Sequence, residues 1–340
     1  MKDLLLDVRG LTTRFESSEG PLHAVDDVDL EVHRGETLGL VGESGSGKSM
    51  LAYSILRLVP SPGRIVAGRV SWKGRDLLEL NEEAMRRLRG REISFIFQEP
   101  SAALNPVLTV GEQVAEPLRI HERLSRRASL ARAVELLREV RLPDPERRIH
   151  DYPHQMSGGM KQRALIAMAI ACSPDLVIAD EPTTALDVTN QAQILDLLAR
   201  LKEEHRLSLI LVSHDLGVVA ENADRVAVMY AGRIVESATV ERLFEDPQHP
   251  YTRGLLHSVP RARGIQGKAK LRSIEGVVPN LAHLPPGCAF APRCPDRFAP
   301  CDRRVPPLVE IQPGHLSACY LHPDVLRAAE TASSSEGLAS

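Results

Sequence analysis

Residues 37–49 read TLGLVGESGSGKS, an apolar run followed by a glycine-rich segment. The apolar run, Thr37–Val41, predicts a short buried strand. The next eight residues match the pattern G-x-x-x-x-G-K-[S/T] in full; they are Gly42, Glu43, Ser44, Gly45, Ser46, Gly47, Lys48 and Ser49. A strand, a glycine loop and a helix in this order indicate a phosphate-binding loop. A plain Gly/Ser-rich turn is the alternative, and the match of every position in this context argues against it.

The chemistry of such a loop explains its residue types. Glycines allow the backbone N–H groups to turn inward around phosphates, and the following helix contributes the positive end of its dipole. We expect Lys48 to reach the β- and γ-phosphates of a nucleotide. We expect the hydroxyl of Ser49 to ligate Mg²⁺.

Short apolar runs alternate with helical patterns along the rest of the chain. The pattern predicts strands at 93–97, 176–179, 209–212 and 225–230, and helices at 112–120, 129–140, 158–171 and 189–204. Alternating strands and helices predict an α/β fold with a mostly parallel sheet covered on both faces. Residues 98–160 read as helix and loop alone, so we interpret them as a helical insert.

Composition limits the classes of protein that this chain can be. The chain has 340 residues, of which 43% are hydrophobic and 26% charged, with a net charge of −3. These values exclude a disordered, collagenous or integral membrane protein, and they give no overall attraction to nucleic acid. The first ten residues contain only three consecutive leucines before Asp7, which is too short for a signal peptide. We therefore expect a cytosolic chain.

Two acids end the expected strand at 176–179. A carboxylate at the carboxyl end of a strand, next to a phosphate loop, can hold the water shell of Mg²⁺, and Asp180 suits that role. Glu181 would point elsewhere and could polarise an attacking water. Alone, two such acids more often mark the start of a helix. The phosphate loop favours the catalytic interpretation.

The segment Ser157-Gly-Gly-Met-Lys-Gln-Arg163 resembles the LSGGQ signature of ABC-type ATPases. Its Ser-Gly-Gly core is intact, although Met156 and Met160 replace the usual leucine and glutamine. Taken alone, it would be a loop and a helix cap, with Ser157 as the N-cap. The resemblance implies a P-loop NTPase fold of the ABC type. It also implies that Ser157, Gly158 and Gly159 bind the γ-phosphate of ATP held by the opposite subunit.

Other segments resemble the same family, over about Leu4 to Leu256. Gln98 resembles the Q-loop glutamine. The resemblance implies that it takes part in catalysis and is a ligand of Mg²⁺. Asp187 closes the Ala185-Leu-Asp stretch that resembles the D-loop, and it too would act in trans. His214 resembles the switch histidine that senses the γ-phosphate. Phe15 resembles the aromatic residue that stacks on adenine. A buried structural role is the alternative for His214 and Phe15.

The chain resembles one branch of the family, the dipeptide, oligopeptide and nickel importers. The stretches that carry this resemblance are 99–113, 247–253 and 285–319. We expect an ABC ATPase domain at 1–256, with a helical subdomain at about 98–160. A small Cys/Pro-rich C-terminal extension follows at 257–330, and a disordered tail at 331–340.

Four of the five cysteines fall in that extension, with the spacing C-x5-C-x6-C-x17-C; they are Cys288, Cys294, Cys301 and Cys319. Disulfides are unusual in the cytosol. Zinc sites usually show a two- to four-residue ligand gap, although Cys319 and His322 could form one mixed pair. Four thiolates can hold a [4Fe–4S] cluster. In some members of the resembled family, four such cysteines hold a cluster of this kind. Zinc and unligated thiols remain the alternatives.

The resemblance implies an ATP-hydrolysing subunit that energises import of short peptides or similar small solutes such as nickel. Its cofactors would be ATP, Mg²⁺ and a [4Fe–4S] cluster. Its partners would be two permease subunits, a second ATPase chain and, indirectly, an extracytoplasmic solute-binding protein. It would lie at the cytoplasmic face of the inner membrane. A soluble ABC ATPase acting on ribosomes or DNA is one alternative. An importer ATPase gated by an iron–sulfur redox sensor is the other.

Overall fold

The computed structural model describes residues 3–18, 20–184, 186–258 and 274–336. The chain divides into two compact units. The first comprises Met1–Leu5, Val32–Thr37 and Arg75–Val212, and the second comprises Leu6–Glu31, Leu38–Gly74 and Ser213–Ser340. Within the described residues, none of the helices combines the length and apolar character needed to cross a membrane.

Three parallel strands form the centre of the first unit. They are β6 (Ile93–Ile96), β7 (Leu176–Asp180) and β8 (Ser208–Ser213). Strand β7 pairs with both neighbours, with Ile93 opposite Leu176 and Leu176 opposite Ser208. All residues of β7 and β8 are buried, as expected of parallel strands covered on both faces. The parallel pairing predicted from the sequence is confirmed here.

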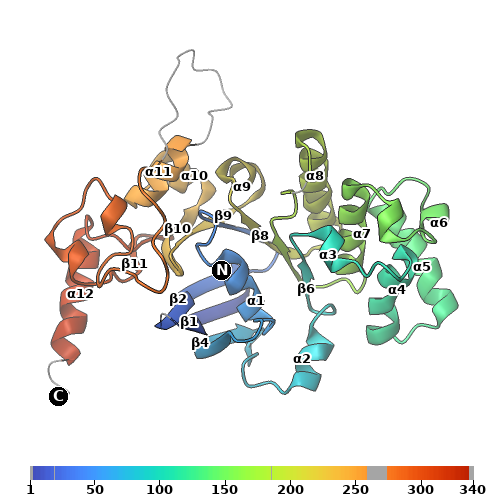
Figure 1. Ribbon diagram of the computed structural model, residues 1–340, viewed down its shortest axis with the longest axis horizontal. Helices are drawn as coiled ribbons and strands as arrows, with labels where there is room; N and C mark the ends of the chain where they lie inside the picture. Colours follow the sequence, from blue (N-terminus) through green and yellow to red (C-terminus); the bar gives the residue numbers. More distant parts are fainter. Residues whose placement is uncertain (1–2, 19, 185, 259–273, 337–340) are drawn as a thin grey trace, which may run out of the picture. The chain divides into compact units, whose positions relative to one another are not determined.

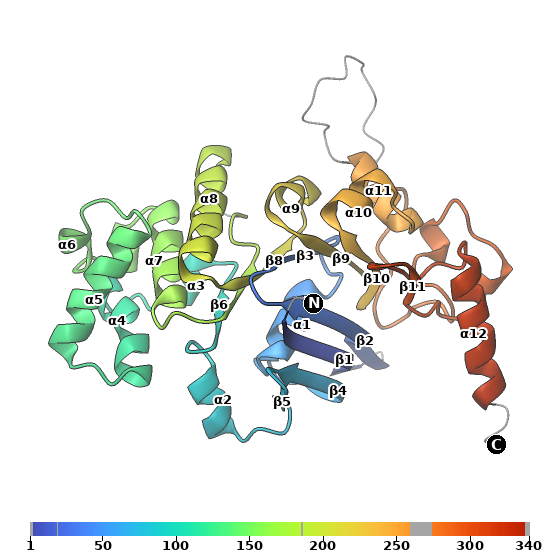
Figure 2. The ribbon, with the colours of Figure 1, turned by 180° about the vertical axis from the view of Figure 1, so that it is seen from behind.

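Between β6 and β7 the described elements are all helical. Polar N-caps begin the longer helices: Thr109, Ser125 and Ser157 each accept a hydrogen bond from the third following N–H. Figures 1 and 2 show α4, α5, α6 and α7 packed together. The helices of the first unit are α2 (Glu82–Leu88), α3 (Pro100–Ala103), α4 (Val110–His121), α5 (Arg126–Glu139), α6 (Pro145–Arg148), η1 (Pro153–Gln155), α7 (Gly158–Ile170) and α8 (Val188–His205); a short strand, β5, covers Arg75–Asp76.

The second unit contains the strand that precedes the glycine loop. Strand β3 (Thr37–Val41) pairs in parallel with β9 (Arg225–Tyr230), and β9 forms an antiparallel hairpin with β10 (Arg233–Thr239). A further sheet, with β1 between β2 and β4, was not predicted. Its long strands are β1 (Leu4–Ser17), β2 (Gly20–His33) and β4 (Arg64–Trp72). The helices here are α1 (Lys48–Ile55), α9 (Leu216–Asn222), α10 (Val240–Glu245) and α11 (Pro250–Ser258).

The C-terminal extension continues the sheet of the second unit. Strand β12 (His315–Ser317) pairs with β10 and with β11 (Val309–Gln312). Two 3₁₀ turns, η2 (Ala291–Arg293) and η3 (Ala299–Asp302), carry the cysteine-rich stretch. The last helix, α12, runs Pro323–Glu336. The disordered tail expected from residue 331 is therefore wrong up to Glu336, because the Ala-rich stretch before it propagates the helix; residues 337–340 lie outside the described residues.

Candidate functional site

The glycine loop lies between β3 and α1, the strand–loop–helix order that the sequence predicted. Helix α1 begins at Lys48, and its N-cap, Gly47, has no side chain to cap the first N–H groups. Gly47 has a φ of 104°, and a Cβ there would lie 2.2 Å from the carbonyl oxygen of Ala24. Only glycine fits this position. The start of α1 therefore offers backbone donors to an anion.

Lys48 spans the inside of the loop. Its side chain is buried, and its Nζ donates hydrogen bonds to the carbonyl oxygens of Gly42 (2.8 Å) and Glu43 (3.0 Å). The loop is also joined to the hairpin, because the N–H of Gly232 donates to the carbonyl oxygen of Ser46 at 2.9 Å. The amino group is thus held close to the path of the loop backbone, where a phosphate would bind.

Two residues that contact the loop were missed by sequence reasoning. The N–H of Glu43 donates to the hydroxyl of Tyr251 at 2.8 Å. The carboxylate of Glu43 forms an ion pair with Arg293, with Nη1 2.7 Å from Oε2. Both partners lie in stretches whose sequence resembles the importer branch. Nothing in those stretches signals a contact more than 200 positions away.

The acids after β7 have different surroundings. Asp180 is 1% exposed at the end of the strand. Glu181 adopts a left-handed φ of 45°, a conformation that costs about 1–2 kcal/mol for a residue with a side chain. Its Oε2 accepts hydrogen bonds from Nε2 of Gln98 (3.0 Å) and from the hydroxyl of Thr184 (2.7 Å). The structure therefore brings together two predicted catalytic residues, Gln98 and Glu181.

The signature segment forms a helix start. Ser157 is the N-cap of α7 and accepts a hydrogen bond from the N–H of Met160 at 3.3 Å, while Gly158 and Gly159 form the first turn. A Cβ on Gly159 would lie 3.5 Å from Oδ1 of Asn190, so the signature lies against the start of α8.

Asp187 is the N-cap of α8. The backbone N–H of Asn190 donates a hydrogen bond to the carboxylate of Asp187, and so does the side-chain amide of Asn190. These bonds, above all the one from the backbone, lower the pKa of Asp187. The signature and Asp187 are therefore neighbours on one surface of the first unit. Ala185 lies outside the described residues.

His214 and Phe15 belong to the second unit. His214 is exposed in the turn between β8 and α9, and the next residue, Asp215, caps α9 by accepting from the N–H of Gly217 at 2.7 Å. Phe15 lies near the end of β1. A Cβ on Gly63 would be 2.4 Å from its ring, so Gly63 packs against one part of that ring.

The predicted site residues are divided between the two units. Gln98, Asp180, Glu181, the signature and Asp187 belong to the first; the phosphate loop, Phe15 and His214 belong to the second. Taken singly, the buried carboxylate of Asp180, the hydroxyl of Ser49 and the amide oxygen of Gln98 are each the kind of hard oxygen ligand that Mg²⁺ prefers.

The four cysteines of the extension line one small cavity together with His249 and Asp296. None of them forms a disulfide. Burial raises the pKa of Cys288 to about 11 and that of Cys319 to about 12, so both thiols are protonated at neutral pH.

The cavity does not fit a [4Fe–4S] cluster as it stands. Its volume is about 20 Å³, room for about one water. Among the described residues, no three or more His, Cys, Asp or Glu side chains are grouped in a way that could hold a metal ion. The predicted gathering of the cysteines is present, but the predicted cluster is not supported.

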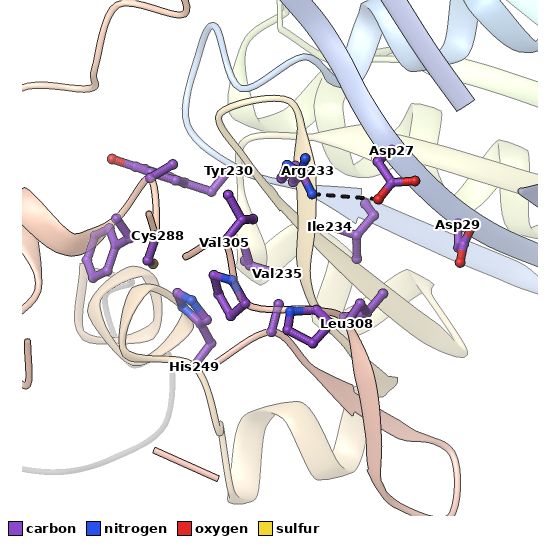
Figure 3. A pocket seen from close by; sticks show the side chains of 15 residues that line it. Asp27, Asp29, Tyr230, Arg233, Ile234, Val235, His249, Cys288, Val305 and Leu308 are labelled. Carbon is purple, nitrogen blue, oxygen red and sulfur yellow. Dashed lines mark ion pairs between the residues drawn. The ribbon is translucent and has the colours of Figure 1, made fainter. Parts of the chain in front are cut away.

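A larger cavity of about 240 Å³ lies beside the cysteine cavity in the second unit and shares His249 and Cys288 with its lining (Figure 3). Asp27 and Asp29 of β2 line it on one side, where Arg233 pairs with Asp27 at 3.8 Å. Residues of β9, β10 and the extension, such as Val235, Phe290 and Leu308, line most of the rest. No residue of the phosphate loop lines this cavity, so it is not the phosphate site.

Comparisons with known proteins match both parts of the chain. Residues 25–184 match the ABC transporter family, and residues 235–301 match the oligopeptide/dipeptide transporter C-terminal region. A probable peptide ABC transporter ATP-binding protein, y4tR of Sinorhizobium fredii, is 56% identical over 95% of this chain and 97% of its own length. The oligopeptide transport ATP-binding protein AppD of Bacillus subtilis is 49% identical over 94% of this chain and 97% of its own length.

A solved structure has a similar fold. The ATP-binding cassette MJ0796, solved as a dimer in a post-hydrolysis state with ADP and Pi, is 30% identical. It aligns with 69% of this chain and 99% of its own, with a TM-score of 0.63. The fold, the phosphate loop and the relatives agree. The chain therefore belongs to the ATP-binding subunits, which are ATPases, of the oligopeptide/dipeptide ABC transporter family.

Proposed function

We propose that ATP hydrolysis by this chain energises uptake of short peptides through partner permeases at the cytoplasmic face of the inner membrane. The observation that carries the proposal is that one chain joins the ATPase to an oligopeptide/dipeptide transporter C-terminal region. Relatives named as peptide transport proteins, which match over nearly their whole length, support the same substrate class.

Within this function the site residues take distinct roles. Lys48 and the N–H groups at the start of α1 bind the phosphates of ATP. Ser49, Asp180 and Gln98 hold Mg²⁺, which neutralises phosphate charge when bound. Glu181, positioned by Gln98, accepts the proton of the attacking water. His214 senses the γ-phosphate, and Phe15 stacks on adenine.

We further propose that two ATPase chains, identical or paralogous, enclose two ATP molecules. The signature helix start of one chain, with Ser157, Gly158 and Gly159, would contact the γ-phosphate in the other, together with Asp187. In support, Ser157 and Gly158 are exposed and α7 begins at this surface. Closure of the dimer would drive the permeases, and hydrolysis would reopen it.

The permease contact is proposed at the loop that follows Gln98. In support, two neighbouring apolar side chains of that loop are exposed: Val107 is 75% exposed, and Leu108 is also exposed. Exposed apolar side chains in a short stretch are typical of a protein contact. A helix of a membrane subunit is the occupant that the family suggests.

The [4Fe–4S] cluster, with Cys288, Cys294, Cys301 and Cys319 as its ligands, stays a proposal, and so does the division at residue 256. Gathering of the four thiols around one cavity supports it; the small volume opposes it. Anaerobic purification with an absorption spectrum and analysis of iron and zinc decides between cluster, zinc and unligated thiols. Absence of iron, with or without zinc, would end the proposal.

Uptake assays test the transport function. In cells that lack this chain, uptake of a radiolabelled tripeptide should fall to background, and wild-type chain should restore it while Lys48→Ala does not. Uptake of radioactive nickel serves as the matched solute control. Normal peptide uptake in the deletion strain would contradict the proposal, as would loss of nickel uptake alone. The soluble ABC ATPase alternative finds no support among the relatives.

A further inference from the structure

The carboxylate and the backbone N–H of one phosphate-loop residue, Glu43, are held from outside the loop. Glu43 is the second residue of the loop, and its side chain is 26% exposed. Arg293 contacts both carboxylate oxygens: Nη1 donates to Oε2 at 2.7 Å, and Nη2 donates to Oε1 at 3.1 Å. The N–H of Glu43 donates to the hydroxyl of Tyr251 at 2.8 Å. Three hydrogen bonds thus fix a residue that Lys48 also contacts through its carbonyl oxygen.

The guanidinium of Arg293 is itself held rigidly. Its side chain is 4% exposed. Its Nε donates to the carbonyl oxygen of Glu275 at 3.1 Å, and its carbon Cζ lies 5.9 Å from the ring centroids of both Tyr230 and Phe290. A planar guanidinium that is bidentate and enclosed by aromatic rings loses little entropy when it binds a carboxylate. The pair with Glu43 is therefore a fixed support and not a mobile surface ion pair.

The hydroxyl of Tyr251 is fixed in the same way. Tyr251 is fully buried on α11, and its ring lies 4.6 Å from the ring of Tyr230 and 5.4 Å from that of Phe290, between centroids. Its hydroxyl accepts a hydrogen bond from the N–H of Glu43, and this N–H therefore points away from the inside of the loop. The first turn of the loop has its shape set by two residues of the C-terminal part of the chain.

We propose that Arg293 and Tyr251 are positioning residues of the ATP site: by holding Glu43 they keep the phosphate loop in the conformation that binds nucleotide. The C-terminal extension then sets the affinity for ATP although it contacts no phosphate. Arg293 ends the turn η2, and its neighbour Cys294 lines the cysteine cavity. The support for the loop is thus built into the cysteine-rich stretch.

Equilibrium binding of Mg-ATP to the purified full-length chain, with steady-state ATPase kinetics, tests the proposal. Arg293→Met should raise the Kd and KM for ATP about 10-fold and change kcat less than twofold. Tyr251→Phe, which keeps the ring and removes only the hydroxyl, should raise the Kd about 3-fold. The matched control is Tyr320→Phe, because the hydroxyl of that buried tyrosine donates to the carbonyl oxygen of Val305, far along the chain from the loop; its Kd should not change.

A double-mutant cycle separates positioning from general stabilisation. If Arg293 acts through Glu43, Arg293→Met combined with Glu43→Gln should bind ATP no more weakly than the weaker single variant. Arg293→Lys keeps the positive charge but cannot make both hydrogen bonds to the carboxylate of Glu43. It should therefore bind ATP more tightly than Arg293→Met and more weakly than wild type. An unchanged Kd in Arg293→Met and Tyr251→Phe, with only a lowered Tm, would overturn the proposal. Fully additive losses in the double variant would overturn it as well. Peptide uptake plays no part in these readouts, so the transport proposal stands or falls separately.

Discussion

The amide Nε2 of Gln98 donates a hydrogen bond of 3.0 Å to Oε2 of Glu181, although the two residues are 83 positions apart. Gln98 follows β6 and Glu181 follows β7, and these strands pair in parallel. The carboxyl ends of paired parallel strands lie at the same edge of a sheet, so side chains that follow them meet. The contact joins the segment proposed to touch the permease to the residue proposed to activate water.

This contact makes a kinetic prediction. Gln98→Ala should lower kcat of the ATPase by about 10- to 100-fold with a smaller change in KM, because Glu181 loses the donor that orients its carboxylate. Steady-state phosphate release measures this. Thr184→Val should reduce kcat less, and Thr184→Ser, which keeps the hydroxyl, is the matched control. Wild-type kcat in Gln98→Ala would show that Glu181 needs no such orientation.

The glycines of the loop predict a contrast between two similar substitutions. Gly47→Ala should abolish Mg-ATP binding, because the added Cβ would lie 2.2 Å from the carbonyl oxygen of Ala24 at a φ of 104°. Gly45→Ala meets no atom within 4 Å and bears only the strain of its positive φ, about 1 kcal/mol. It should bind ATP within about 10-fold of wild type by isothermal titration calorimetry. Equal binding by both variants would contradict the loop geometry.

Because His249 is buried, we expect the stability of the second unit to fall at acid pH. Burial lowers the pKa of His249 from 6.5 to about 4, and its Nδ1 accepts the N–H of Tyr251 at 3.0 Å. The unfolded chain binds this proton below about pH 6.5 while the folded chain stays neutral to about pH 4. The free energy of unfolding should therefore fall as the pH drops through this window, by a contribution on the order of 3 kcal/mol.

His249→Asn provides the control, because its amide oxygen can replace the accepting Nδ1 without titrating. Urea unfolding followed by circular dichroism at pH 7.5 and pH 5 measures both proteins. The variant should lose less stability than wild type between these values. Identical losses in the two proteins would remove His249 as the cause.

The thiols of the extension predict an alkylation profile. Because burial raises the pKa of Cys288 to about 11, the rate of its reaction with iodoacetamide should rise nearly tenfold per pH unit between pH 7 and 10. Mass spectrometry of the peptide that contains Cys288 follows the rate. A rate that reaches its plateau near pH 8.5, the ordinary thiol pKa, would show that the side chain is not buried as described.

Local sequence patterns predicted those parts of the molecule that depend on neighbouring residues. The run 37–49 predicted strand, loop and helix, because glycine spacing and the apolar run determine that geometry locally. Ser157 was predicted as a helix cap for the same reason. The antiparallel strand β1, by contrast, carries charged residues at solvent-facing positions, and its pairing with β4 involves residues at least 50 positions away.

The contacts of Glu43 could not be predicted for a similar reason. A glutamate in a glycine loop and an arginine beside a cysteine are each ordinary at the surface, and only tertiary packing pairs them. The cysteine spacing predicted that four thiols gather, and they do line one cavity. The spacing of the cysteines carries no information on the volume left between their sulfurs. That volume is small, and the predicted cluster therefore lacks support.

In the proposed mechanism, Glu181 is the base for ATP hydrolysis, which takes place between two chains. Glu181→Gln measures it most directly, by the ATPase rate together with light scattering in Mg-ATP and in Mg-ADP. Turnover should fall more than 100-fold, and the variant should form a dimer in ATP but not in ADP. Undiminished hydrolysis by Glu181→Gln, or a variant that stays monomeric in ATP, would contradict it.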